Sequence, residues 1–107
     1  MNQLNPRELA DWLAAPDRAK PVLLDVREPW EFQVCHIQDS VHIPMSAVPT
    51  KVTALDSDAA IVVICHHGAR SMQVAQFLQR NGFENLYNLN GGVAAWAQVV
   101  DPTMPTY

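Results

Sequence analysis

Short apolar runs separated by polar turns are the main pattern of this chain. Residues 22–26 and 60–64 are almost wholly apolar and too short for buried helices, so each predicts a buried strand. The second run is rich in β-branched residues, which predicts the central strand of a sheet. Residues 86–89 predict a further strand and residues 41–43 a brief one.

Helix signals lie between these runs. Asn5 is typical of an N-cap, Pro6 fits the first helical position, and Glu8 can complete a capping box. Residues 71–80 carry apolar side chains at helical spacing, and Asn81-Gly82 provides a stop for that helix. The apolar face of the first helix is expected to contain Leu9, Trp12 and Leu13.

Weaker signals predict three shorter helices. Pro29 favours one that runs through Val34, and Ser46 can cap another whose first turn accommodates Pro49. A last helix is expected after Asn90-Gly91-Gly92, with an apolar face formed by Val93, Trp96 and Ala97. The proline-containing residues 100–107 are expected to form a loosely held tail.

The alternation of strands and helices predicts an α/β fold with a mainly parallel sheet and helices on both faces. A length of 107 residues fits one domain, residues 1–107, with one compact core. The apolar content of 49% and charged content of 17% are those of an ordinary globular protein.

Charge and cysteine content narrow the classes of function. The net charge of -4 argues against a broad nucleic-acid surface and favours a small or protein-borne partner. The first residues do not resemble a signal segment, and no run approaches the length of a membrane span, so we expect a cytoplasmic protein without membrane contact. Cys35 and Cys65 are too few for a disulfide framework and too far apart for a C-x-x-C motif.

Cys65 follows the predicted central strand directly, at the position where open α/β sheets bind ligands. The segment Cys65-His66-His67-Gly68-Ala69-Arg70 must curl tightly before the next helix, and Gly68 permits the backbone geometry of such a curl. Inward N–H groups and the N-terminus of the helix that begins near Ser71 would favour a thiolate at Cys65. A buried, inert cysteine is the alternative, but packing explains the polar residues that follow poorly.

Three further loop residues have a functional and a plain interpretation. The guanidinium of Arg70 can bind the oxyanion of a substrate, or it can be a solvated residue of a first helical turn. A cation there opposes the helix dipole, which favours a ligand. His66 and His67 can raise the local potential or move protons, or they can simply face solvent.

With this loop in view, the chain resembles the rhodanese family over nearly its whole length. Residues 23–28 (Leu-Leu-Asp-Val-Arg-Glu) look like the first signature of the family. The His-Ile of 36–37 and the His-Ile-Pro of 42–44 look like the second, and residues 88–96 (Asn-Leu-Asn-Gly-Gly-Val-Ala-Ala-Trp) look like the C-terminal one. The resemblance implies a rhodanese-like fold with a sheet of about five strands.

The resemblance also implies a reaction. In rhodaneses a cysteine takes the outer sulfur of thiosulfate, releases sulfite, and passes the sulfur to cyanide or a thiol, with no metal or organic cofactor. That role falls to Cys65, with residues 66–70 binding the substrate. The six-residue loop has the length associated with sulfur substrates, whereas phosphatases of the same fold use a longer one. The partners implied are therefore an anionic sulfur donor and a thiol or cyanide acceptor, which can be a sulfur-accepting protein.

Other residues are expected to support the loop. Asp25 and Arg27 lie at the C-terminal end of the first of the predicted buried strands, where a carboxylate can pair with an arginine, and we group Ser71 with them. Cys35 replaces the glycine that usually precedes His-Ile, so it would be strained if that position required positive φ. A disulfide between Cys35 and Cys65 is a further alternative. The tryptophans are interpreted as core or packing residues: Trp12, Trp30 and Trp96.

Three functions compete at this point. An active thiosulfate sulfurtransferase is the first. A non-catalytic or accessory module, which relays sulfur or docks a partner protein, is the second, and the intact Cys65 and Arg70 count against a purely structural version of it. A phosphatase or arsenate reductase is the third, and the short loop disfavours it.

Overall fold

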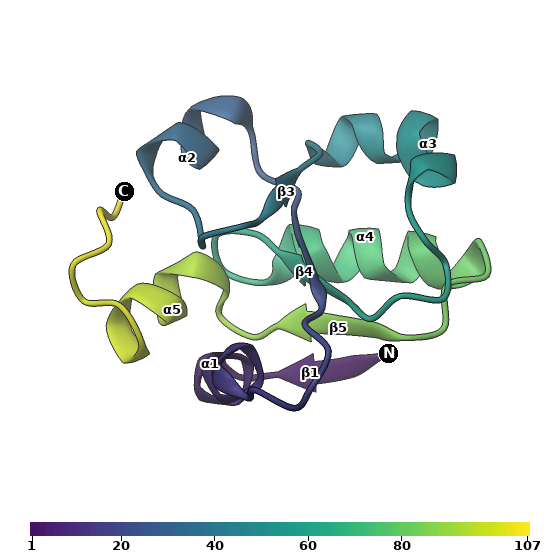
Figure 1. The fold of residues 1–107 in the computed structure, drawn as a ribbon. Helices are drawn as coiled ribbons and strands as arrows, with labels where there is room; N and C mark the ends of the chain where they lie inside the picture. Colours follow the sequence, from purple (N-terminus) through teal and green to yellow (C-terminus); the bar gives the residue numbers. More distant parts are fainter.

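A parallel β-sheet forms the centre of the molecule. In the computed structural model, which describes all 107 residues, five strands lie in the order β1-β5-β4-β2-β3, and every neighbouring pair is parallel (Figure 1). This confirms the predicted α/β fold, with the β-branched run as its central strand. The strands are β1 (Asn2–Leu4), β2 (Val22–Asp25), β3 (Val41–His42), β4 (Ile61–Ile64) and β5 (Leu86–Leu89).

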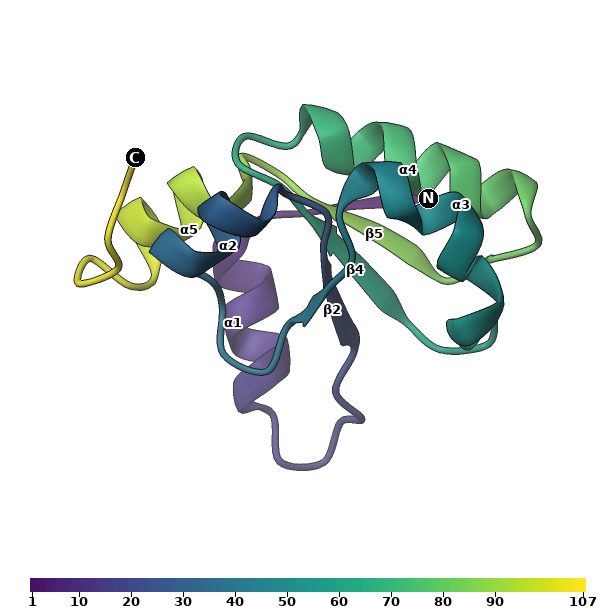
Figure 2. The same ribbon diagram turned by 90° about the horizontal axis from the view of Figure 1, so that it is seen from above.

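Five α-helices cover the sheet. Figure 2 shows α3 and α4 on one side of the sheet and α1 and α5 on the other, as the sequence predicts. Two 3₁₀ turns flank α3, at Met45–Ala47 and Val52–Ala54. None of the helices is both long and apolar enough to span a bilayer. The helices are α1 (Pro6–Ala14), α2 (Pro29–Val34), α3 (Val48–Lys51), α4 (Ala69–Arg80) and α5 (Gly92–Val99).

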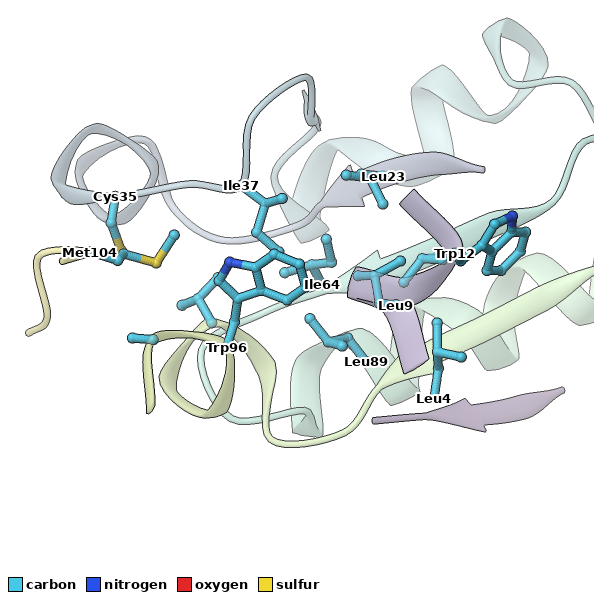
Figure 3. Close-up of a cluster of buried hydrophobic side chains, with 13 residues drawn as sticks. Leu4, Leu9, Trp12, Leu23, Cys35, Ile37, Ile64, Leu89, Trp96 and Met104 are labelled. Atoms are coloured by element: carbon cyan, nitrogen blue, oxygen red, sulfur yellow. The ribbon is translucent and has the colours of Figure 1, made fainter. Parts of the chain in front are cut away.

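Apolar side chains of the sheet point alternately to two cores. In β4, Val62 and Ile64 enter the core under α1 and α5, whereas Ile61 and Val63 enter the core under α4. All four are fully buried, which is why this strand reads as a continuous apolar run. Figure 3 shows the first core, which includes Leu4, Leu9, Trp12, Leu23, Ile37, Leu89 and Trp96.

The ends of the helices follow the predictions in part. Asn5 caps α1, accepting the N–H of Glu8 at 2.8 Å, while the Glu8 carboxylate accepts the N–H of Asn5 at 2.9 Å. Ser46 is not an N-cap, because it lies inside the 3₁₀ turn and α3 begins after Ala47 without a side-chain cap. Helix α4 begins at Ala69, two residues earlier than predicted, since Gly68 serves as its N-cap.

The tail and Trp30 differ from their sequence-based interpretation. Met104 is 9% exposed and packs in the core with Cys35 and Trp96 (Figure 3), so the segment 100–107 is anchored rather than loose. The Tyr107 hydroxyl makes hydrogen bonds to side chains of the loop after β2 and of α2. Trp30, expected in the core, is 59% exposed and packs edge-on against the Tyr107 ring at 5.3 Å.

Close packing between α5 and the loop after β4 fixes the position of Cys65. The N–H of Val93 donates to the Cys65 carbonyl at 2.9 Å, and the N–H of Ala94 donates to the His66 carbonyl at 3.1 Å. These bonds satisfy N–H groups that a helix start otherwise leaves unpaired. Gly92, at φ +57°, has no room for a side chain, because a Cβ would lie 2.2 Å from the Cys65 carbonyl oxygen.

We therefore expect Gly92→Ala to lower the free energy of unfolding by about 3 kcal/mol or more, since left-handed strain adds to a backbone clash that only a loop displacement can relieve. Gly82→Ala is the matched control. Gly82 has φ +90°, and a methyl group added to it would meet no atom within 4 Å, so this variant should lose only about 1–2 kcal/mol through backbone strain. Equal losses in urea denaturation would contradict the close packing behind Cys65.

Candidate active site

The candidate site lies at the carboxyl ends of the central strands. Cys65 directly follows β4, and Arg27 follows the neighbouring strand β2. Crevices at this edge are the usual ligand sites of open parallel sheets. Cys65 is only 1% exposed, so its sulfur lies at the base of the loop rather than on the surface.

Two groups contact the Cys65 sulfur. The N–H of Gly68 donates to Sγ at 3.0 Å, and the thiol lies 3.3 Å from Oγ of Ser71, to which it donates. Gly68 reaches this position because its φ of +109° turns the chain sharply. One amide therefore faces the sulfur, where the sequence suggested several, and a hydroxyl is the second polar contact.

Ser71 is itself held by the neighbouring strand. Its hydroxyl donates to the amide oxygen of Asn88 and lies 3.1 Å from the Gly68 carbonyl. The amide nitrogen of Asn88 donates in turn to the Gln3 side chain at 3.1 Å. Ser71 and Asn88 are both buried, so this chain of hydrogen bonds orients the hydroxyl that meets the sulfur.

Asp25 and Arg27 form a buried ion pair beside the loop. Arg27 Nη2 lies 2.7 Å from Asp25 Oδ2, and its Nε donates to Oδ1 at 2.9 Å. The same guanidinium donates to the carbonyl of Cys35 at 2.6 Å and to that of Glu31 at 3.3 Å, both in the segment of α2. Burial alone would lower the pKa of Arg27, but its hydrogen bonds, above all to Asp25, raise the pKa above its ordinary value. Asp25 thus has the partner that its place in an apolar strand demands.

Arg70 has a partner that the sequence did not indicate. Its Nη1 and Nη2 donate to the two carboxylate oxygens of Glu31, at 2.6 and 2.8 Å. The Arg70 side chain is 32% exposed and that of Glu31 only 5%. Arg70 is therefore neither a solvated residue nor an unpaired cation, because a carboxylate already compensates its charge.

Glu31 is the more constrained member of this pair. Its carboxylate also accepts the N–H of Glu28 at 3.0 Å and the hydroxyl of Tyr107 at 2.7 Å. The hydrogen bonds from Arg70 lower the pKa of Glu31 to about 2 against the effect of burial. Burial raises the pKa of Tyr107 to about 12, so the Tyr107 hydroxyl keeps the proton that it donates.

The two loop histidines lie against each other and against the tail. The rings of His66 and His67 are 4.0 Å apart, and the other neighbour of His66 is the Tyr107 ring, stacked at 4.2 Å. Partial burial and the neighbouring His67 lower the pKa of His66 from its usual 6.5. The neutral form of His66 therefore predominates at pH 7, so it adds little positive charge to the loop.

Cys35 is unstrained and packs in a different hydrophobic core from Cys65. Its φ of -162° is extended backbone that any residue adopts, so the replacement of the usual glycine has no conformational cost. Cys35 and Cys65 are both free thiols. Cys35 Sγ lies 3.8 Å from Arg27 Nη1 and packs in the core beside Met104.

Two cavities bear on the position of the site. The one beside the loop has a volume of about 240 Å³. A larger one of about 510 Å³ lies between α1, α5 and the segment after α2, and no residue of the Cys65 loop lines it. The smaller cavity is lined by His66, His67, Val93, Ala94, Gln98, Pro105, Thr106 and Tyr107.

Comparison with known proteins agrees with this geometry. The family model described as "Rhodanese-like domain" matches residues 5–99. The chain belongs to this family. A solved structure of a rhodanese-related protein from Thermoplasma volcanium shares the fold, with a TM-score of 0.81, 33% identity and 92% of each chain covered. The rhodanese fold expected from the resemblance is thereby confirmed.

Curated relatives of this rhodanese-like domain carry sulfurtransferase names. A sulfurtransferase of Allochromatium vinosum is 33% identical over 92% of this chain and 90% of its own length. The thiosulfate sulfurtransferase GlpE of Pseudomonas aeruginosa is 36% identical over 79% of this chain and 83% of its own length. The chain spans only 21% and 26% of two longer relatives named as adenylyltransferase and sulfurtransferase. These relatives support sulfur transfer as the general role of the domain.

The sequence analysis assigned no role in the site to three residues that the structure places there: Glu31, Asn88 and Tyr107. Asn88 carries a usable signal, since it is a polar residue inside an otherwise apolar strand. The sequence around Glu31 indicates only a short helix. Its partner Arg70 lies 39 positions away, so no local pattern predicts the pair. Tyr107 lies in a segment without periodicity, so nothing in the sequence indicates that it reaches the rhodanese loop.

The lowered pKa of Glu31 predicts a specific acid sensitivity. Because the folded value of about 2 lies below the ordinary 4.5, ionised Glu31 stabilises the fold fully above pH 4.5, and this contribution is lost as the pH falls toward 2. The shift corresponds to about 3 kcal/mol. Chemical denaturation of the wild type and Glu31→Gln should show stabilities that converge as the pH falls through this window. Parallel pH profiles would contradict the assignment.

Proposed function

We propose that this domain is a thiosulfate sulfurtransferase that carries sulfane sulfur as a persulfide on Cys65. The observation that carries the proposal is the environment of the Cys65 sulfur, which receives the Gly68 N–H at 3.0 Å at the carboxyl end of the central strand. An N–H aimed at sulfur and a helix N-terminus behind it stabilise negative charge there. Both thiolate and persulfide anions need such stabilisation.

The reaction divides into two displacements at sulfur. The Cys65 thiolate attacks the outer sulfur of thiosulfate, a new S–S bond forms, and the bond to the sulfonate sulfur breaks, so that sulfite leaves with its electron pair. Cyanide or a thiolate then attacks the outer persulfide sulfur, and the Cys65 thiolate is released. Neither step needs an external oxidant or reductant, and this is covalent nucleophilic catalysis.

The burial of Cys65 fits this two-step scheme. An outer sulfur extends about 2 Å beyond Sγ, the length of an S–S bond. With Cys65 only 1% exposed, the outer sulfur is the atom that projects toward an acceptor. The cavity of about 240 Å³ beside His66 and His67 offers room for a small thiol.

Two features support thiosulfate or a persulfide as the donor. The loop from Cys65 to Arg70 has six residues, the length expected for sulfur substrates. GlpE, a relative at 36% identity, is named a thiosulfate sulfurtransferase. In this proposal Gly68 and Ala69 supply the backbone of the loop, and Ser71, Asp25 and Arg27 support it.

An accessory sulfur-relay module is the second candidate. It is favoured by the match to about a fifth or a quarter of longer relatives that combine adenylyltransferase and sulfurtransferase in their names. A relay module would accept sulfur on Cys65 from a protein persulfide and would show little turnover with thiosulfate alone.

The decisive measurement is intact-protein mass after incubation with thiosulfate. We expect the wild type to gain one sulfur and to lose it on addition of cyanide, because the first step forms the persulfide and the second step consumes it. Cys65→Ser should gain nothing. Cys35→Ser is the matched control and should gain sulfur like the wild type, since Cys35 packs in the core away from the loop. If the protein is folded and reduced but gains no sulfur, the sulfur-relay module is favoured over the thiosulfate sulfurtransferase.

Arg70→Ala should raise KM for thiosulfate by about tenfold or more, with a smaller change in kcat. The substitution removes a cation and also leaves the Glu31 carboxylate uncompensated, so an anionic donor meets net negative charge. Steady-state kinetics with thiosulfate and cyanide measure this. Unchanged KM in the variant would exclude Arg70 from donor binding.

A further inference from the structure

The two arginines of the site are both neutralised by the protein itself. Arg27 lies against Asp25 at 2.7 Å, fully buried, and Arg70 is held through two hydrogen bonds by Glu31. A donor that binds at the loop therefore meets the Arg70–Glu31 ion pair rather than a free cation, whereas Arg27 is buried out of its reach. The net positive charge near the Cys65 sulfur is therefore lower than the presence of two arginines suggests.

Glu31 keeps this arrangement fixed. Besides Arg70, its carboxylate is held by the N–H of Glu28 and the hydroxyl of Tyr107, and the residue is 4% exposed. These three hydrogen-bond partners hold the Glu31 carboxylate in place when a substrate binds. It remains ionised throughout the pH range in which a thiolate can act, because its pKa is about 2.

His66 does not restore the missing positive charge. The His66 ring stacks on Tyr107 and is tilted against His67, and burial together with His67 lowers its pKa below 6.5, so the neutral form predominates at pH 7. The guanidinium of Arg70 still has N–H groups that Glu31 does not use, since five donors are available and two are engaged. These N–H groups can orient an anionic donor. The second negative charge of a dianion has no further cation to pair with.

We propose that Glu31 is a specificity-determining residue that compensates Arg70, weakens the binding of dianionic donors such as thiosulfate, and favours donors with less charge, such as persulfides and thiosulfonates. This inference rests on the proposed sulfurtransferase function. Glu31 acts through Arg70 and does not touch the reacting atoms, so it affects donor binding rather than the displacement at sulfur.

Two donors isolate the effect of one charge. Thiosulfate carries two negative charges and releases sulfite, whereas methanethiosulfonate carries one and releases methanesulfinate. In both cases the Cys65 thiolate forms an S–S bond to the outer sulfur, and the bond to the oxidised sulfur breaks with its electron pair on the leaving group. The product on the protein is the same persulfide.

The test is the KM of each donor in wild type and in Glu31→Gln. Glutamine keeps an oxygen for the Glu28 N–H while removing the charge. We expect KM for thiosulfate to fall about tenfold and KM for methanethiosulfonate about threefold, with kcat little changed, because the Coulomb energy doubles with the charge of the donor. Added salt should reduce the difference.

Two further variants separate charge from structure. Glu31→Asp keeps the charge and should retain the wild-type ratio of the two KM values. Glu84→Gln removes an exposed carboxylate in the loop before β5, without an ion pair in the structure, and should leave both KM values unchanged. If Glu31→Gln folds poorly, two measurements still test the proposal. These are the ratio of the two KM values in Glu31→Asp and the salt dependence of that ratio in the wild type.

Failure of this inference differs from failure of the proposed function. If neither donor adds sulfur to the wild type, the sulfurtransferase proposal fails first. If both donors form the Cys65 persulfide but Glu31→Gln changes the two KM values equally, or changes only kcat, then Glu31 has no role in donor selection.

Discussion

The buried guanidinium of Arg27 is the constraint on which the arrangement of the site depends. A charge at 0% exposure is tolerated only where it is paired and its hydrogen-bond donors are used, and breaking such a pair costs about 3–5 kcal/mol. Asp25 supplies the counter-charge from β2, the carbonyls of Glu31 and Cys35 bind two further N–H groups, and Tyr107 completes the set. Arg27 thus fixes α2 and the tail relative to the sheet, and with them the carboxylate that meets Arg70.

The Cys65 loop is consequently held from two directions by different kinds of interaction. From one side, the first turn of α5 binds the carbonyls of Cys65 and His66, and Gly92 allows the two backbones to touch. From the other side, α2 presents Glu31 to the first turn of α4. The backbone contact determines where the sulfur lies, whereas the ion pair places a carboxylate against the guanidinium of Arg70.

Local patterns predict most of the fold and the position of Cys65 at the end of the central strand, and long-range pairing explains what they miss. Residues 60–64 and the capping box at Asn5 act within a few positions, so their sequence and structure agree. Strand β1 is three residues long and has no pattern of its own, because its partner β5 lies at the other end of the chain. The expectation of a core position for Trp30 rests on residue type alone. Its exposed position reflects a contact with Tyr107 that no periodicity encodes.

The order of the strands also has a consequence for how the chain acquires its structure. Leu4 of β1 pairs with Leu89 of β5, so the first strand of the domain pairs only after the last one has been synthesised. Pairing across such a separation is entropically costly and slow compared with local contacts. During synthesis, β2 and β4 can associate while residues 2–4 remain unpaired. The final closure of the sheet then coincides with formation of the β5 to α5 segment, whose hydrogen bonds to the Cys65 and His66 carbonyls secure the loop that holds Cys65.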